Sequence, residues 1–240
     1  MPLIIDTVPL LSDNYAWILH DTATGNTAVV DPGEADSVHA FLNTQGYRLN
    51  DIFLTHHHAD HINGASALRQ HYGARILGPR DQRLQSLVDE NLQEGDLLSL
   101  GESHGHVLAT PGHTLSHLCY YFSNPSALFC GDTLFSLGCG RLFEGTAEQL
   151  FESFLKIIAL PPQTWICCGH EYTLANADFA FHVDPTNHAL KERITQVRSL
   201  RSKGQPTLPS TLEQELATNP FLRAPNAQIL KHLRQEKDTF

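Results

Sequence analysis

The 240-residue chain is short of basic residues, of Trp and Met, and of long apolar runs. It contains one Met and two Trp, and its 16 Lys or Arg are outnumbered by 26 Asp or Glu. The resulting formal charge of −10 argues against a nucleic-acid partner or an anionic membrane surface. No apolar run approaches the roughly 18 residues that a membrane span needs. Because 41% of the residues are hydrophobic, we nevertheless expect a folded protein with a sizeable core.

Cysteine is also scarce, and its spacing argues against disulfides. The five cysteines include no Cys-x-x-Cys pair, and Cys167 and Cys168 are adjacent. All except Cys139 lie in apolar, strand-like runs, where a thiol acts as a small hydrophobe; Cys139, between two glycines, is expected to be more exposed. The N-terminus shows no basic region typical of a secretory signal. We therefore expect reduced thiols, a cytoplasmic location and, since nothing demands more, a monomer.

The pattern of the chain changes near residue 170. Residues 1–170 hold 18 acidic and 7 basic side chains, whereas residues 171–240 hold 8 and 9. Before residue 170, short runs rich in Val, Ile, Leu, Phe and Tyr alternate with Gly and Pro loops, which is typical of an α/β domain. After it, helical periodicity dominates. We expect an α/β domain over residues 1–170 and a small all-α domain over residues 171–240.

The expected elements follow from local patterns. Strands are expected at residues 3–11, 15–19, 27–30, 52–54, 75–77, 107–109, 117–122, 127–130 and 164–168. Helices are expected at residues 35–45 and 64–72, and after a capping box formed by Thr146 and Gln149. The apolar stripe of that third helix is predicted to contain Leu150, Phe151, Phe154, Leu155 and Ile158. A second capping box is predicted at Ser210 and Glu213.

Histidine, in contrast, is abundant, with 15 residues. Five apolar runs each lead to a potential metal ligand: Asp31, His56, His113, Asp132 and His170. In α/β sheets, sites form where loops leave the carboxyl ends of strands, so ligands from several strand ends can converge on one rim. A Gly directly before each of the last three lets the backbone turn sharply there.

The sharpest motif covers residues 55–61, with the spacing His-x-His-x-Asp-His. In extended chain, His56 and His58 point the same way and can share a metal, while His57 points elsewhere. Asp60 and His61 lie past the turn, where they could serve a second metal. Imidazole and carboxylate ligands suit zinc, manganese or iron. Alone, such a run could also be a solvated tract or a weak metal-scavenging patch, but the other ligand-bearing loops argue against that interpretation.

Together these motifs resemble the metallo-β-lactamase superfamily, over the whole first part of the chain in order and spacing. The resemblance implies an α/β fold, a four-layer αβ/βα sandwich with a metal site at one edge, here followed by the small all-α domain. It implies two divalent ions held by seven ligands: His56, His58 and His113 on the first, Asp60, His61 and His170 on the second, and Asp132 as the bridge. Zinc is the expected metal, with iron or manganese as alternatives.

The closer resemblance is to the glyoxalase II (hydroxyacylglutathione hydrolase) family. It rests on residues 131–135, 138–141, 143–146 and 168–173, and on the C-terminal helical part that ends in residues 234–238. It implies a thioester hydrolase that converts S-D-lactoylglutathione to glutathione and D-lactate, the second step of methylglyoxal detoxification. A water between two divalent ions is hydroxide near neutral pH and would attack the thioester carbonyl, with Asp60 and Asp132 as catalytic ligands.

The same resemblance implies glutathione contacts for five residues: Arg141, Phe143, Tyr172, Arg234 and Lys237. From spacing alone, Arg234 and Lys237 would be solvated charges on one helix face. Phe143 stands where some relatives have Tyr, so a hydroxyl contact is expected to be missing. Ala59 and Asn63 also depart from the family pattern, and altered packing is expected at the mouth of the site.

Two residues are candidates for supporting the ligands, because a metal-binding His usually donates its other N–H to a carboxylate or carbonyl. Asp31 is the first, although it could equally be the turn residue of an Asp-Pro-Gly sequence. His117 is the second, although it could simply pack or hydrogen-bond locally.

Several other functions were weighed against thioester hydrolysis. A phosphodiesterase or RNA-processing nuclease of the same fold would need the basic surface that residues 1–170 lack. A β-lactamase would normally be exported. A glutathione persulfide dioxygenase needs one iron and fewer ligands than the seven present. A non-catalytic, metal-stabilised binding module would normally use a closed, Cys-rich zinc site.

Overall fold

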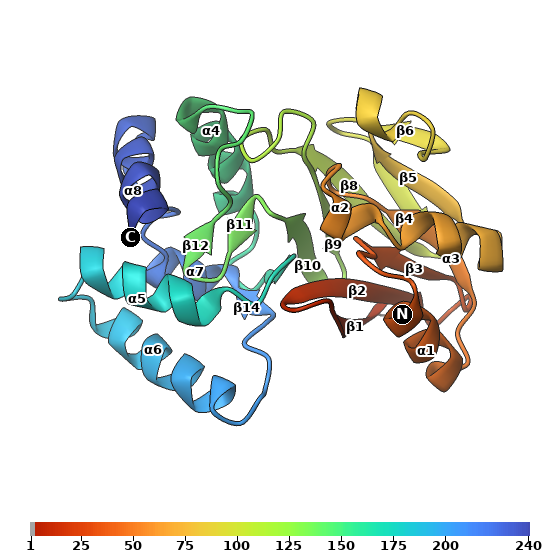
Figure 1. The fold of residues 1–240 in the computed structure, drawn as a ribbon, viewed down its shortest axis with the longest axis horizontal. Coiled ribbons are helices and arrows are strands. Elements are labelled where there is room, and N and C mark those ends of the chain that lie inside the picture. The colour runs from red at the N-terminus through yellow and green to blue at the C-terminus, as the bar shows by residue number, and fades with distance from the viewer. Residues whose placement is uncertain (1–2) are drawn as a thin grey trace. The chain divides into compact units, whose positions relative to one another are not determined.

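The short apolar runs in the first part of the chain form strands, as expected. The computed structural model describes residues 3–240, which fall into two compact units. Of these described residues, the first unit comprises 3–109 and 116–131, and the second comprises 110–115 and 132–240. Figure 1 shows the elements of both. The expected boundary near residue 170, which concerns sequence segments, stays a prediction.

The first unit contains two sheets. The elements that build the first are β1 (Leu3–Leu10), β2 (Asn14–Asp21), β3 (Thr27–Val30), α1 (Asp36–Gln45), β4 (Leu49–Phe53), α2 (Ala59–Ile62), α3 (Ala65–Tyr72), β5 (Arg75–Pro79), a 3-10 turn (Gln82–Leu84) and β6 (Glu90–Leu92). The second contains β7 (Leu97–Leu100), β8 (Ser103–Ala109), β9 (Leu118–Ser123) and β10 (Ser126–Gly131).

The direction of the strands places the ligand segments of this unit at one edge. In the sheet of order β1-β2-β3-β4-β5-β6, the pairs β1–β2 and β2–β3 are antiparallel, whereas β3, β4, β5 and β6 run parallel. The carboxyl ends of β3 and β4 therefore lie at the same edge, where Asp31 leaves one strand and the segment of His56 leaves the other.

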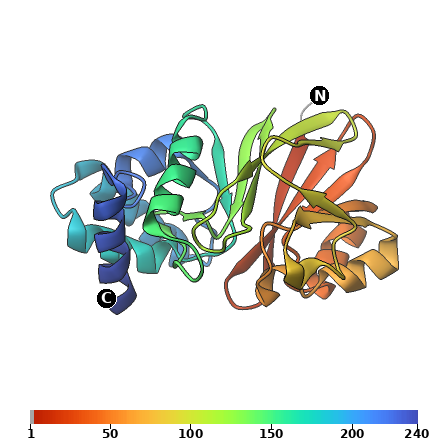
Figure 2. The ribbon, with the colours of Figure 1, turned by 90° about the horizontal axis from the view of Figure 1, so that it is seen from above.

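The two sheets of this unit pack face to face through aromatic side chains. The rings of Trp17 in β2 and Phe129 in β10 lie 6.3 Å apart, and those of Phe53 in β4 and Tyr120 in β9 lie 5.6 Å apart. Helices α1 and α3 cover the other face of the β1–β6 sheet (Figure 2), where Leu42 belongs to the buried apolar core. The layers of this unit are thus helix, sheet and sheet.

The second unit is mainly helical. Its elements are β11 (Leu134–Phe135), β12 (Gly138–Cys139), α4 (Ala147–Ile158), β13 (Trp165–Cys168), α5 (Thr173–Val183), α6 (His188–Arg201), β14 (Ser210–Thr211), α7 (Leu212–Thr218) and α8 (Ala227–Thr239). Strands β11 and β12 form a hairpin, and β13 pairs antiparallel with β14. Helices α4 and α8 lie side by side in both ribbon views, as do α5 and α6.

Local predictions in this unit were confirmed in part. The capping box of Thr146 and Gln149 is present at the start of α4. The second box is shifted by one residue, to Thr211 and Gln214, because β14 pairs with β13 through both Ser210 and Thr211, so α7 begins only at Leu212. In α4, Leu155 is 45% exposed and Ile157 is buried in its place.

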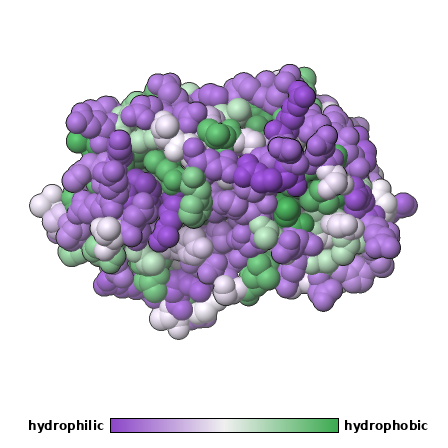
Figure 3. Space-filling model, turned by 45° about the horizontal axis from the view of Figure 1, so that its top comes forward, coloured by the Kyte–Doolittle hydropathy of each residue, from purple (hydrophilic) through white to green (hydrophobic). Residues whose placement is uncertain are grey.

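The face of the molecule drawn in Figure 3 is polar over much of its area. On the face drawn in Figure 3, apolar side chains gather only in small separate groups. Among residues 3–240, no helix combines the length and the apolarity that crossing a lipid bilayer would require.

Candidate metal centre and substrate pocket

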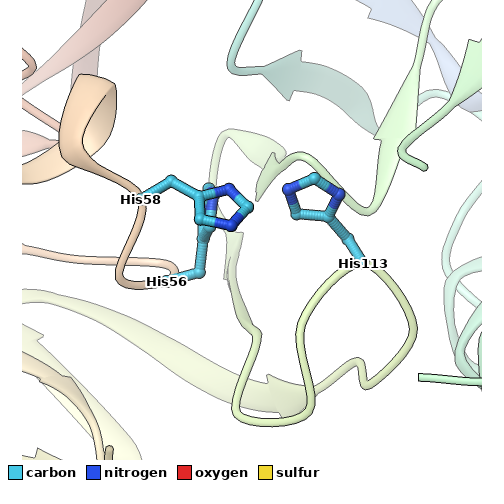
Figure 4. A group of neighbouring side chains, drawn as sticks. All are labelled: His56, His58 and His113. Carbon is cyan, nitrogen blue, oxygen red and sulfur yellow. The ribbon is translucent and has the colours of Figure 1, made fainter. Parts of the chain in front are cut away.

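The histidine motif of the first unit lies on the segment between β4 and α2. Figure 4 shows the imidazoles of His56 and His58 next to one another on this segment, and their rings are 4.6 Å apart. Each offers a ligand nitrogen, and these nitrogens lie within 4.8 Å of one another. The side chain of His57 instead lies with Nδ1 3.7 Å from Asp81 Oδ2. The expected neighbourhood of His56 and His58 is therefore present, although residues 55 and 56 lie in a bend and not in extended chain.

Asp60 and His61 form the second pair of this unit. His61 Nε2 lies 3.5 Å from Asp60 Oδ2, and the Asp60 side chain is 41% exposed while that of His61 is buried. Asn14 donates through Nδ2 to Asp60 Oδ2 at 2.9 Å, which orients the carboxylate. The contribution of Asn14 was not predicted, because the 46 residues between the partners leave no local signal.

Asp31 fixes the tautomers of His61 and, through the Thr55 hydroxyl, of His56. It lies at the end of β3 with a φ of 52°, is 3% exposed, and its Oδ2 is 3.0 Å from His61 Nδ1. Thr55 donates its hydroxyl to Asp31 Oδ2 at 2.6 Å, so its oxygen is free to accept from His56 Nδ1 at 3.0 Å. Both Nδ1 atoms are then proton donors, and both Nε2 lone pairs are available to a metal. The role of Thr55 was not predicted.

His117 lies against the ring of His56. It is fully buried, and the two imidazoles stack at 4.9 Å with an interplanar angle of 22°. A Cβ on Gly131 would come within 2.8 Å of His117 Nε2 and 2.4 Å of Thr55 Oγ1, so only glycine fits there. The structure thus places His117, like Asp31, beside a predicted ligand.

The second unit brings together the three predicted ligands of its loops. His113 lies on the loop after β8, Asp132 precedes the β11–β12 hairpin, and His170 follows β13. The Nε2 atoms of His113 and His170 each lie 3.5 Å from Asp132 Oδ2. All three residues are buried. Two imidazole nitrogens that converge on one carboxylate oxygen suit a carboxylate that bridges two ions, so this donor set fits the implied metals.

The outer nitrogen of His113 is fixed by the main chain. Nδ1 lies 2.8 Å from the carbonyl oxygen of Arg141, which can only accept, so Nδ1 carries the proton and Nε2 is the ligand atom. Thr110 and Thr133 join their hydroxyls at 2.9 Å, which ties the His113 loop to the segment of Asp132. No sequence pattern could reveal a contact made by a main-chain carbonyl.

A pocket of about 360 Å³ opens beside these ligands in the second unit. Two of the ligands, His113 and Asp132, line it. All five residues predicted to contact glutathione line it as well: Arg141, Phe143, Tyr172, Arg234 and Lys237. Tyr172, Arg234 and Lys237 follow Asp132 by 40 to 105 positions in the chain, yet they line the same cavity.

The three basic residues of the pocket differ in how they are held. Arg141 is 64% exposed and lies 3.6 Å from Asp238. Arg234 is 5% exposed: it donates to the Cys139 carbonyl at 2.8 Å and pairs with Asp238 at 3.0 Å. Its guanidinium is thus buried and hydrogen-bonded in the pocket wall, whereas the spacing alone predicted a solvated charge.

Lys237 and Cys139 complete the polar wall. Lys237 donates to the Ala175 carbonyl at 3.1 Å, and burial together with neighbouring Arg234 lowers its pKa. The expectation that Cys139 is more exposed than the other cysteines was wrong, because the hairpin and Arg234 cover it and leave 4% of it accessible. Burial raises the pKa of its thiol to about 11, so it stays protonated near neutral pH.

The two aromatic residues of the pocket stand beside the ligand imidazoles. Tyr172 stacks on His170, with ring centroids 4.5 Å apart and planes 7° from parallel. Phe143 meets His113 edge to face at 5.3 Å and remains 63% exposed. Each ring therefore offers one face or edge to the pocket while its other side restrains a ligand.

Comparisons with known proteins agree with this architecture. Residues 12–170 match the description "Metallo-beta-lactamase superfamily", and residues 171–240 match "Hydroxyacylglutathione hydrolase C-terminus". A hydroxyacylglutathione hydrolase of Cereibacter sphaeroides is 45% identical over 255 aligned positions, which span 100% of both chains. Among solved structures, ETHE1 from Myxococcus xanthus is 26% identical, with a TM-score of 0.75 over 97% of this chain and 90% of that one.

One further solved structure bears on metals. TTHA1623 in a di-iron-bound form is 25% identical, with a TM-score of 0.60 over 70% of this chain and 91% of that one. The fold, with mixed sheets flanked by helices and a helical C-terminal part, is thus the metallo-β-lactamase fold that was predicted. The chain belongs to the metallo-β-lactamase superfamily and, within it, to the hydroxyacylglutathione hydrolase family.

Proposed function

We propose that the chain hydrolyses S-D-lactoylglutathione to glutathione and D-lactate. One observation carries the proposal: the pocket of the second unit is lined both by ligand residues and by the basic and aromatic residues expected to hold glutathione. Glutathione is anionic overall, and Arg141 and Lys237 are cations with accessible surface in an otherwise acidic protein. Family membership supports the same substrate class.

We propose that seven residues hold two divalent ions, the set that the sequence motifs imply: His56, His58, Asp60, His61, His113, Asp132 and His170. Support comes from the donor set that each unit presents and from the Nδ1 contacts that leave Nε2 available. When bound, such ions would lower the pKa of a water and polarise a thioester carbonyl. Zinc is the proposed metal; a similar protein binds iron, and availability also decides.

The residues of the chain supply positioning and charge. Arg141 and Lys237 would meet the carboxylates of glutathione, and Tyr172 and Phe143 would flank its thioester end beside the ligands. Asp60, with one oxygen oriented by Asn14, remains exposed enough to orient the attacking water. The thiolate leaving group has a reference pKa near 8.5, so it can leave without a dedicated proton donor.

The proposed setting is a reducing one. All five cysteines are buried thiols, which supports a cytoplasmic location. The formal charge of −10 supports a protein with no nucleic acid or membrane as partner, and a monomer is proposed. The proposed domain division at residue 170 gives a catalytic segment followed by a helical substrate-binding segment, and the two family matches meet at the same residue.

The decisive experiment combines metal counting with two substrates. Purified protein is loaded with zinc or iron, its metal content is measured, and thioester cleavage of S-D-lactoylglutathione is followed together with oxygen uptake on glutathione persulfide. We expect close to two ions per chain, thioesterase activity and no oxygen uptake. Asp132→Asn should lower kcat/KM by at least about 100-fold. Metal ions stabilise the charge of the transition state by several kcal/mol, and loss of the bridging carboxylate would weaken that stabilisation. Full metal loading without thioesterase activity would refute the proposal.

A further inference from the structure

The hairpin that follows Asp132 turns through a strained residue. Strands β11 and β12 pair so that Ser136 and Leu137 form the turn. Leu137 has a φ of 59°, a left-handed conformation that is unfavourable for a residue with a Cβ. Two-residue hairpin turns usually place Gly, Asn or Asp at such positions. A buried Leu there needs support from outside the hairpin.

That support comes from the C-terminal helical part of the chain. The carboxylate of Glu215 in α7 accepts the Leu137 N–H at 2.8 Å and the Ser136 hydroxyl at 2.8 Å. Asn219, just after α7, places Nδ2 3.0 Å from the carbonyl oxygens of both Phe135 and Gly138. Glu215 and Asn219 are fully buried, and their side chains meet at 3.1 Å. Polar groups on both strands of the hairpin and in its turn thus hydrogen-bond to the side chains of Glu215 and Asn219.

Helix α5 holds the hairpin from a second side. Asn176 donates through Nδ2 to the Ser136 carbonyl at 3.1 Å, and a Cβ on Gly138 would come within 2.4 Å of that amide. The Leu137 side chain packs in a buried cluster with Ala177 of α5 and Leu190 of α6. The turn therefore has one position relative to α5, α6 and α7.

The hairpin in turn abuts two predicted metal ligands. It ends at Cys139, and a Cβ on the next residue, Gly140, would come within 2.0 Å of the Asp132 carbonyl oxygen and 2.9 Å of His113 Nδ1. The residue after that, Arg141, supplies the carbonyl that fixes the His113 tautomer. A shift of the hairpin by a few tenths of an ångström would thus move the backbone that orients both ligands.

We propose that Glu215 and Asn219 are positioning residues: by clamping the 136–137 turn, they set the orientation of His113 and Asp132 and the wall of the pocket. The helical C-terminal part then serves the metal ligands as well as substrate binding. The ligand roles rest on the proposed function. The clamp itself rests on the hydrogen bonds of the second unit.

The test compares Glu215→Gln with Glu213→Gln, an exposed carboxylate on the same helix. Glutamine keeps the size of the side chain but presents an N–H₂ donor to a site where the Ser136 hydroxyl, the Leu137 N–H and the Asn219 amide now donate. Ser136→Ala is the milder variant, since it removes the hydroxyl bond to Glu215 and the 3.4 Å contact with Arg193 but leaves the Leu137 N–H held by Glu215. Leu42→Ala, in the core under α1, controls for lost stability alone. Zinc dissociation constants, backbone amide exchange over residues 134–141, melting temperature, kcat and KM are measured for all.

We expect Glu215→Gln to weaken zinc binding about 10- to 100-fold, the range seen when partners of metal ligands are removed. Exchange over residues 134–141 should quicken at least tenfold while other segments stay unchanged, and Ser136→Ala should show the same changes to a smaller degree. Glu213→Gln should match the wild type, and Leu42→Ala should lower only the melting temperature. Zinc affinity and hairpin exchange in Glu215→Gln equal to those of Leu42→Ala would overturn the clamp. Absent thioesterase activity in the zinc-loaded wild type would overturn the proposed function, while exchange and affinity would still judge the clamp.

Discussion

His113 Nδ1 lies 2.8 Å from the main-chain carbonyl oxygen of Arg141. This contact settles which nitrogen of His113 faces Asp132, and it explains why a glycine precedes Arg141. The space between the carbonyl of Asp132 and the imidazole of His113 is filled by the backbone of Gly140. Arg141 therefore has two separate tasks: its side chain lines the pocket, and its carbonyl orients a ligand.

Gly140→Ala should weaken metal binding by at least about tenfold, because the added methyl would meet the Asp132 carbonyl carbon and oxygen and displace both ligands. The φ of Gly140 is not in the left-handed region, so the effect is steric. Gly46→Ala is the control. A methyl group added at Gly46 would meet open space, but the φ of 71° disfavours alanine, so the variant should lose about 1 kcal/mol of stability and keep its metal content. Metal retained after dialysis and the melting temperature distinguish them. Equal metal content in both variants would contradict the steric explanation.

Asp31→Asn should lower metal affinity about 10- to 100-fold. The two carboxylate oxygens of Asp31 accept from the Thr55 N–H, the Thr55 hydroxyl and His61 Nδ1, whereas an amide has one oxygen and would turn its N–H₂ group toward at least one of these donors. Asp21→Asn is the matched control, another buried acceptor carboxylate in the same unit. Burial would raise the pKa of Asp21, but hydrogen bonds from Ser103 and Thr24 outweigh it and lower the pKa from 3.8 to about 2. Its stabilisation is thus present above pH 3.8 and lost as the pH falls toward 2. Chelator competition should show weaker metal binding only in Asp31→Asn, and acid unfolding should show the lost stability of Asp21→Asn. Weaker metal binding in Asp21→Asn would contradict a specific role for Asp31.

The proposed ligands could be recognised as candidates from the sequence because their signal is local. The spacing of His56 and His58 predicts a common side, and the structure places their two rings next to one another. The strand ends that deliver Asp31 and Asp132 are marked by apolar runs and glycine turns. These patterns depend on residues a few positions apart, so one sequence suffices to recognise them.

What could not be predicted depends on contacts between distant segments or on the main chain. Asn14 reaches Asp60 across 46 residues, and Glu215 reaches Leu137 across 78. Cys139 was expected to be exposed because glycines flank it, yet Arg234, 95 residues later, covers it. The capping box was displaced from Ser210 to Thr211 because strand pairing, which no local pattern reveals, decides where α7 begins.

The affinity for substrate should fall at alkaline pH through Lys237. Burial, and to a lesser degree Arg234 beside it, lower the pKa of this lysine below its usual 10.5. Lys237 binds a carboxylate only when protonated, so KM should rise as the pH climbs through this lowered pKa. Lys237→Arg should keep KM flat over the same range because guanidinium stays charged to above about pH 12. Lys237→Met should raise KM at every pH. KM is measured between about pH 7 and pH 10; an unchanged alkaline rise in Lys237→Arg would show that another group titrates.

Phe143→Tyr should tighten substrate binding. The Phe143 ring is 63% exposed beside His113, so a hydroxyl can be added there without burying a polar group. A new hydrogen bond to the peptide of glutathione, worth about 0.5–1.5 kcal/mol, would lower KM by about 2- to 10-fold. Because that bond would be equally strong in the ground and transition states, kcat should stay constant. Phe143→Leu, which removes the ring and keeps an apolar side chain, should raise KM instead. A change in kcat with an unaltered KM would contradict this prediction. It would mean that residue 143 acts through its edge-to-face contact with the imidazole of His113, which the substitution had disturbed.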